Sequence, residues 1–169
     1  QQNDLKSLGI LICLNTGLRV GEVCALRWEN VDFETRRIHV EKTIERIYSK
    51  EENKTIVIID TPKSITSVSN ILKQIRGKSK KTDFVLTGSS EHYVEPRNYQ
   101  YHFKEILKRS KVKKYKFHTL RHTFATNCIE AGMDIKSLSE ILGHADVSIT
   151  LNIYVHSSDK AKRKYLEKI

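Results

Sequence analysis

Apolar residues in the first part of the chain recur at the spacing of an α-helix. Leu5, Leu8 and Ile12 lie on one face of a helix predicted over residues 5–15. A glycine follows at position 17, and glycine is frequent just beyond a helix C-terminus. A second, short helix is predicted at about residues 20–27. The chain is therefore expected to open with two helices.

The pattern changes to β-branched residues after position 31. Residues 37–44 and 55–59 are rich in isoleucine, valine and threonine, and a polar stretch at 48–54 separates them. This arrangement predicts two antiparallel strands joined by a hairpin loop. Residues 64–69 are rich in serine and threonine, and no element is predicted there.

After Pro96 the pattern becomes helical again. Four helices are predicted. The first begins at Pro96, and the second ends at Gly132. The third extends from Asp134 to Gly143 and the fourth from Asp146 to Tyr154. The apolar stripe of the second one is formed by Leu120, Phe124, Cys128 and Ala131. A basic amphipathic tail is predicted at 159–169. These elements predict one α+β domain over residues 1–169, mainly helical, with a small antiparallel sheet in its N-terminal half.

Charge narrows the choice of partners. The 169 residues include 30 Lys and Arg against 20 Asp and Glu, a net charge of +10. Seven basic residues lie within 104–116, and a second basic run covers 160–164. Such clusters favour nucleic acid, with a merely solubilising surface as the alternative. No apolar run approaches the roughly 20 residues that span a membrane, and no signal peptide is recognisable, so a cytoplasmic protein is expected.

Neither a metal nor a cofactor is predicted. The three cysteines are widely spaced and form no CxxC pair, which argues against a disulfide framework or a cysteine zinc site. His118 and His122 lie one helical turn apart, but Thr119 stands where a zinc protease has glutamate. The glycine-rich loops that bind ATP or dinucleotides are also missing from the sequence.

Two side chains of the predicted helix before Gly132 are suited to phosphate. His118 and Arg121 are separated by about 60° around the helix axis, and we expect them to project side by side, off the core. A guanidinium offers a fork of N–H donors that matches two phosphate oxygens, and an imidazole adds a third donor. A solvated polar face is the alternative interpretation of the same pair.

Further candidates lie at both ends of the chain. Arg19 stands between two glycines at the start of a helix, and Glu22, three residues on, is placed to form a salt bridge with it. His144 follows a glycine that ends a helix, so it is expected on a loop, free to point into a cleft. Tyr154 comes ten residues later. An ordinary turn and an amphipathic packing residue are the alternatives for Arg19 and Tyr154.

Four stretches together resemble the catalytic domain of the tyrosine recombinase, or phage integrase, family. They are TGLRVGEVCALRW at 16–28, TPKS at 61–64, HTLRHTFAT at 118–126 and LGHADVSITLNIY at 142–154. They extend over nearly the whole chain in the family's order and approximate spacing. The strand insert and the TPK motif are similar to integrases of conjugative transposons and of phages of Gram-positive bacteria. The resemblance implies the DNA breaking–rejoining fold and integration or excision of a mobile element.

The resemblance also implies a role for individual residues. Tyr154 would attack the scissile phosphate and form a 3′-phosphotyrosyl bond. Arg19 and Arg121 would hold the non-bridging oxygens, and His118 and His144 would complete the phosphate pocket. These roles agree with the chemistry, because fixed donors stabilise the negative charge of the transition state. A phenol with a pKa near 10 also needs a base, for which His118 is the candidate.

A lysine on the β-hairpin protonates the departing 5′-oxygen in this family. Lys63, within TPKS, is the candidate for this general acid. The chain departs from the family pattern just after it, because residues 64–71 read SITSVSNI where a basic residue and Ile-Pro usually follow. Lys42, on the preceding predicted strand, is the alternative.

The resemblance implies double-stranded DNA as partner, at the bacterial nucleoid, and a synaptic tetramer on that DNA. It also implies N-terminal core-binding and arm-binding domains outside this chain. The tail at 159–169 would pack against a neighbouring protomer or on its own domain, and a monomer is expected without DNA because one short helix buries little area. A type IB topoisomerase and a non-catalytic DNA-binding module are the two alternative functions.

Overall fold

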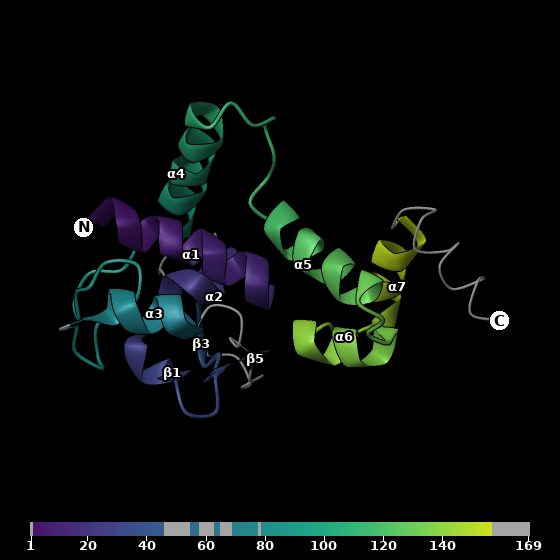
Figure 1. The fold of residues 1–169 in the computed structure, drawn as a ribbon, viewed down its shortest axis with the longest axis horizontal. Coiled ribbons are helices and arrows are strands. Elements are labelled where there is room, and N and C mark those ends of the chain that lie inside the picture. Colours follow the sequence, from purple (N-terminus) through teal and green to yellow (C-terminus); the bar gives the residue numbers. More distant parts are fainter. Residues whose placement is uncertain (1, 46–54, 58–62, 65–68, 78, 157–169) are drawn as a thin grey trace, which may run out of the picture.

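The computed structural model describes residues 2–45, 55–57, 63–64, 69–77 and 79–156 (Figure 1). Within these residues the helices are α1 (Gln2–Thr16), α2 (Val20–Ala25), α3 (Ser69–Arg76), α4 (Pro96–Arg109), α5 (Thr119–Glu130), α6 (Ile135–Leu142) and α7 (Val147–His156), with a 3-10 helix at Trp28–Asn30. The strands are β1 (Val31–Asp32), β2 (Arg37–Ile38), β3 (Lys42–Ile44), β4 (Thr55–Val57) and β5 (Lys63–Ser64). The mainly helical α+β class is confirmed. The predicted tail at 159–169 lies outside the described residues.

The strands form two small antiparallel sheets, one of order β1-β2-β5 and one of β3 and β4. The predicted strand pair is confirmed, because β3 pairs antiparallel with β4 and Thr43 lies opposite Ile56. The predicted single strand at 37–44 is wrong: β2 and β3 belong to different sheets. The backbone N–H of His39 donates to the Asn30 carbonyl at 2.9 Å, which extends the pairing of β2 with β1 by one residue.

One predicted helix has a different end in the structure, and one helix of the structure, α3, was not predicted. The short second helix ends at Ala25, two residues earlier than predicted, because Leu26 is extended and its carbonyl accepts the Val85 N–H at 2.9 Å. α3 begins at Ser69, at the end of the segment where no element is predicted. The later helices follow their predicted ends, since α4 starts at Pro96 and α6 is capped by Asp134, which accepts the Ser137 N–H at 2.9 Å.

The apolar stripe predicted for α5 is only partly right. Phe124 and Cys128 are half-buried and Ala131 is exposed, whereas Ala125 and Ile129 are fully buried. The reason is that α5 is covered from more than one side, with α1 on one flank and α6 and α7 on another (Figure 1). Apolar residues on a wider arc of α5 are therefore buried than a single stripe predicts.

Gly17 sets the distance between the first helices and α5. It ends α1 with a φ of +67°, in the left-handed region that favours glycine. A Cβ at this position would lie 2.6 Å from Phe124 Cδ1 and 2.9 Å from Leu142 Cδ2. The turn between α1 and α2 therefore packs directly on α5 and α6. This close approach brings the candidate site residues of distant segments together.

The core is divided into a large and a small cluster. The large cluster joins α1, α2, α4 and the first strands, and its fully buried side chains include Ile12, Trp28 and Tyr99. The small cluster lies between α5 and α6 and consists of Ala125, Ile129, Leu138 and Leu142. None of the helices in the described part of the chain is long and apolar enough to cross a membrane.

Candidate active site

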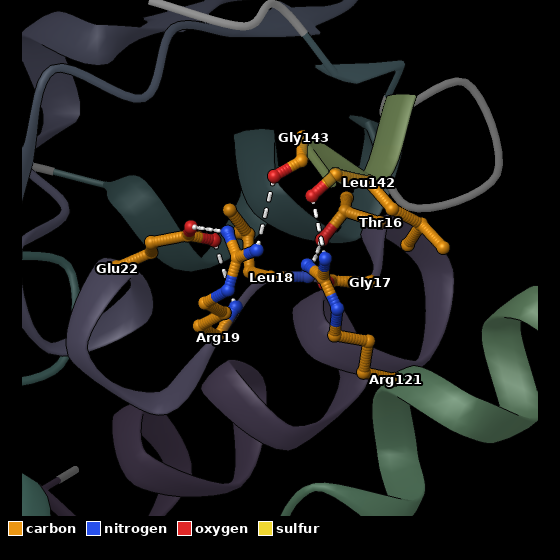
Figure 2. A network of polar contacts seen from close by, with 8 residues as sticks. All are labelled: Thr16, Gly17, Leu18, Arg19, Glu22, Arg121, Leu142 and Gly143. Carbon is orange, nitrogen blue, oxygen red and sulfur yellow. Dashed lines mark hydrogen bonds and ion pairs between the residues drawn. The ribbon is translucent and has the colours of Figure 1, made fainter. Parts of the chain in front are cut away.

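Arg19, at the start of α2, is held in place by two groups, one from α2 and one from the end of α6. Its Nη1 forms an ion pair with Glu22 Oε1 at 2.8 Å, and its Nη2 donates to the Gly143 carbonyl at 3.1 Å (Figure 2). The other carboxylate oxygen of Glu22 accepts the Arg19 backbone N–H at 2.8 Å. Glu22 is only 3% exposed, and both of its carboxylate oxygens bind Arg19. The predicted salt bridge is confirmed.

Arg121 is buried, with 2% of its surface exposed. The expectation that its guanidinium projects off the core is therefore wrong. Its Nη1 donates to the Gly17 carbonyl at 2.7 Å and its Nη2 to the Leu142 carbonyl at 2.5 Å (Figure 2). These carbonyls lie at the ends of α1 and α6, and they satisfy a cation that would otherwise be costly to bury.

Burial also alters the acid–base properties of this guanidinium. Desolvation lowers the pKa of Arg121 to about 10, and the positive charge of Arg19 acts in the same direction. The group therefore remains a cation at neutral pH. The two guanidinium groups lie close together, because Arg19 donates to the Gly143 carbonyl and Arg121 to the preceding carbonyl, that of Leu142.

His118 lies at the N-terminus of α5 and is exposed. Its ring packs edge-on against His122, with 4.6 Å between the ring centroids. Partial desolvation lowers the pKa of His118, and His122, Arg121 and Arg19 add to the shift in that order. Because a lower pKa favours the neutral imidazole, His118 can accept a proton at neutral pH.

Arg19, His118 and Arg121 line one cavity of about 920 Å³, which we call the arginine cavity. Three more basic side chains from α4 and the segment before α5 also line it, namely Arg97, Lys104 and Lys116. These five Lys and Arg side chains outnumber the two carboxylates in the lining, Glu45 and Glu95. The cavity therefore has an excess of positive charge.

Two of these basic residues, Lys104 and Lys116, belong to the predicted basic run at 104–116, whereas Arg97 was not among the residues predicted for the site. The sequence does contain a signal for the position of Arg97: it directly follows Pro96, which marks the start of a helix, so it falls in the first turn of α4. It also forms a cation–aromatic pair with the exposed Tyr101, at 5.9 Å from the ring centroid. The exposed face of α4 thus presents both a cation and an aromatic ring.

His144 is in the loop between α6 and α7, as predicted, and is half-buried. Its Nδ1 lies 2.9 Å from the hydroxyl oxygen of Thr150, a residue of α7. It directly follows Gly143, whose carbonyl holds Arg19. The structure therefore links His144 to the two arginines through the backbone of one loop, although His144 is not among the described residues that line the arginine cavity.

The remaining candidates are placed by their backbones. Tyr154 belongs to α7, one turn after Thr150, and Lys63 belongs to β5, opposite Ile38 of β2. Lys42 is exposed on β3, opposite Val57. The side chains of Tyr154 and Lys63 lie outside the described part of the structure, so the geometry brings together the arginines and His118 and leaves the other roles as predictions. Within the described residues, no three His, Cys, Asp or Glu side chains are grouped as metal ligands would be.

The fold is that of the tyrosine recombinases. XerA recombinase, in its crystal structure, has a TM-score of 0.71 and 28% sequence identity, over 98% of this chain and 58% of that chain. The Tn1549 transposon integrase, in complex with circular intermediate DNA, has a TM-score of 0.73 and 25% identity, over 94% of this chain and 58% of that chain. The chain thus has the catalytic-domain architecture predicted from its motifs.

Sequence comparison agrees with the fold. Residues 2–161 match the sequence model of the Phage integrase family, and the chain belongs to this family. It is 32% identical to the "Tyrosine recombinase XerC-like" protein of Caldanaerobacter subterraneus subsp. tengcongensis, over 96% of this chain and 48% of that protein. It is 29% identical to the "Transposase from transposon Tn916" of Enterococcus faecalis, over 94% of this chain and 45% of that protein. The chain spans about half the length of these relatives.

Proposed function

We propose that this chain is the catalytic domain of a tyrosine site-specific recombinase that cleaves and rejoins double-stranded DNA. The observation that carries this proposal is the arginine cavity, where Arg19 from the start of α2 meets His118 and Arg121 from the start of α5. Fixed cations around one cavity are what a phosphodiester requires as it gains negative charge in the transition state. Family membership supports the same reaction.

In the proposed reaction the phenolate oxygen of Tyr154 attacks the scissile phosphorus. A bond forms between that oxygen and phosphorus, and the bond from phosphorus to the 5′-oxygen breaks. The products are a 3′-phosphotyrosyl linkage and a free 5′-hydroxyl, and rejoining reverses these steps. The energy of the phosphodiester is retained in the covalent intermediate, so no external energy source is needed.

Each polar group has a task in this reaction. Arg19 and Arg121 donate to the non-bridging oxygens, and His144 adds a further donor. His118 accepts the phenolic proton of Tyr154, a task for which its lowered pKa suits it. Lys63 gives a proton to the departing 5′-oxygen, and Lys42 is the competing candidate for this step.

The partner we propose is double-stranded DNA at the bacterial nucleoid, and the process is integration or excision of a mobile element. The basic lining of the arginine cavity from α4 and the segment before α5 supports contact with phosphates on either side of the scissile one. The recombinases similar to this chain include an integrase in complex with DNA. We propose a tetramer on two DNA duplexes and a monomer without DNA.

A nicked suicide substrate tests the function. Loss of the short 5′-hydroxyl fragment prevents rejoining, so the wild-type chain should accumulate a covalent adduct with the 3′ end of the DNA. Tyr154→Phe removes the nucleophilic oxygen and should bind DNA without forming the adduct, while Tyr93→Phe, at an exposed position on another segment, is the matched control. An adduct with Tyr154→Phe would disprove the assignment.

A further inference from the structure

The hydroxyl of Thr150 is buried against the ring of His144. Thr150 lies in α7 and is 0% exposed, and its Oγ1 is 2.9 Å from His144 Nδ1. Two other threonines in helices, Thr16 and Thr123, donate to the carbonyl one turn earlier, at 2.7 and 2.9 Å. Thr150 has no such bond among the described residues. Its hydroxyl is therefore available to the imidazole.

The position of one proton follows from this contact. A buried hydroxyl that donates to nothing costs free energy, so the Thr150 hydrogen needs an acceptor. Within the described part of the chain, His144 Nδ1 is the acceptor in reach. If Nδ1 carried the proton and donated to Oγ1, the hydroxyl hydrogen would have no partner. The bond therefore runs from Thr150 Oγ1–H to Nδ1, and the neutral ring carries its proton on Nε2.

We propose that Thr150 is a positioning residue that fixes His144 as the Nε2–H tautomer, so that Nε2 donates a hydrogen bond to a phosphate oxygen of the DNA. This inference rests on the proposed function for its final step, the donation to phosphate. The tautomer itself depends only on the contact between the two side chains. His144 in this state is a neutral donor and does not act as the base of the reaction.

The location of Thr150 gives this contact a second consequence. Thr150 is four residues before Tyr154 on α7, and residues at this spacing lie on the same face of a helix. The start of α7 is fixed in turn by Asp146, whose Oδ1 accepts the Ser148 N–H at 2.8 Å. The helix that bears the proposed nucleophile, Tyr154, therefore also orients His144. A movement of α7 would shift the positions of both residues together.

Nitrogen NMR of the ring-labelled chain tests the tautomer without any DNA. At about pH 8, well above the usual histidine pKa of about 6.5, His144 should show a protonated Nε2 and an unprotonated Nδ1 shifted by its hydrogen bond. His144→Asn identifies the signal. Thr150→Ser should preserve the Nδ1 shift and Thr150→Val should remove it. A protonated Nδ1 in the wild-type chain would overturn the proposal even if a variant fails to fold.

Cleavage of the suicide substrate tests the positioning role. Thr150→Val should form the covalent adduct about tenfold more slowly, the usual effect of losing one hydrogen bond, and Thr150→Ser should cleave at close to the wild-type rate. The decisive comparison is in the His144→Ala background, where Thr150→Val should cause no further loss. Equal slowing by Thr150→Val in both backgrounds would mean a structural role and would refute the proposal.

The two proposals fail in distinguishable ways. If the wild-type chain gives no adduct but His144 shows the bonded Nε2–H state, the recombinase function is wrong and the tautomer assignment stands. If the wild-type chain gives the adduct and Thr150→Val cleaves normally, the function stands and the positioning role of Thr150 is wrong.

Discussion

The guanidinium groups of Arg19 and Arg121 donate to two consecutive carbonyls, those of Gly143 and Leu142 (Figure 2). These carbonyls end α6, directly before His144. The last carbonyls of a helix have no partner within it and carry partial negative charge, so they are natural acceptors for cations. Arg19 and Arg121, which are about 100 residues apart in the sequence, are thereby held next to each other by the last turn of α6.

Arg121→Lys tests this alignment. Lysine keeps the positive charge but loses the fork that reaches the Gly17 and Leu142 carbonyls together. We expect a loss of about 1–3 kcal/mol in the free energy of unfolding, because a buried carbonyl loses its donor. Most cleavage should be lost while DNA binding is largely retained. Denaturant unfolding, the suicide-substrate assay and filter binding measure these three effects, and near-normal cleavage would return Arg121 to a purely structural role.

Glu22→Gln tests the support of Arg19. Glutamine can still accept the hydrogen bonds of Arg19, but the ion pair at 2.8 Å loses its charge. Cleavage should slow by about tenfold, a loss of roughly 1.4 kcal/mol in transition-state stabilisation, with little change in DNA affinity. Glu29→Gln, at an exposed site just after α2, is the matched control. Equal rates for the two variants would contradict a positioning role for Glu22.

The lowered pKa of His118 predicts a specific pH dependence. In the chain without DNA, its imidazole should titrate below the usual value of about 6.5. The neutral form, which accepts the proton, should therefore persist to lower pH than in an ordinary histidine. His122→Asn should move the midpoint upward without restoring it fully, because desolvation is the larger cause. Proton NMR measures the midpoint, and a value at or above 6.5 would refute this interpretation.

A sulfur-substituted substrate separates Lys63 from Lys42. A general acid is needed only for a poor leaving group, and a bridging 5′-sulfur departs without a proton. Lys63→Ala should be slow on normal DNA and restored on the sulfur substrate, whereas Arg19→Ala should not be restored. Restoration of Lys42→Ala alone would place the acid on β3. If neither lysine variant is restored, the proton comes from another group.

Short-range signals in the sequence predicted the α-helices of the described residues with the exception of α3. Asp134 and Gly143 bracket α6 as predicted, because capping depends on residues within one turn of the helix end. Pro96 marks the start of α4 for the same reason. The pairing of β3 with β4 was also predicted, since alternating β-branched residues favour it over any other local arrangement.

The misassigned features depend on partners far away in the sequence. The predicted strand at 37–44 is divided because β2 pairs with β1 and β5, whereas β3 pairs with β4 in a separate sheet. The burial of Arg121 depends on carbonyls that the turns at Gly17 and Leu142 present to it, and no pattern within α5 reveals them. The candidate residues were found from their motifs, but the support that Thr150 gives to His144 became visible only in the structure.

Mass spectrometry of the covalent adduct tests the central claim most directly. The tryptic peptide of residues 137–160 contains a single tyrosine, Tyr154. After cleavage of the suicide substrate in excess EDTA and nuclease digestion, this peptide should carry a nucleotide joined through its 3′-phosphate to Tyr154. A nucleotide on a different residue, or DNA cleaved with no attached protein, would contradict the account.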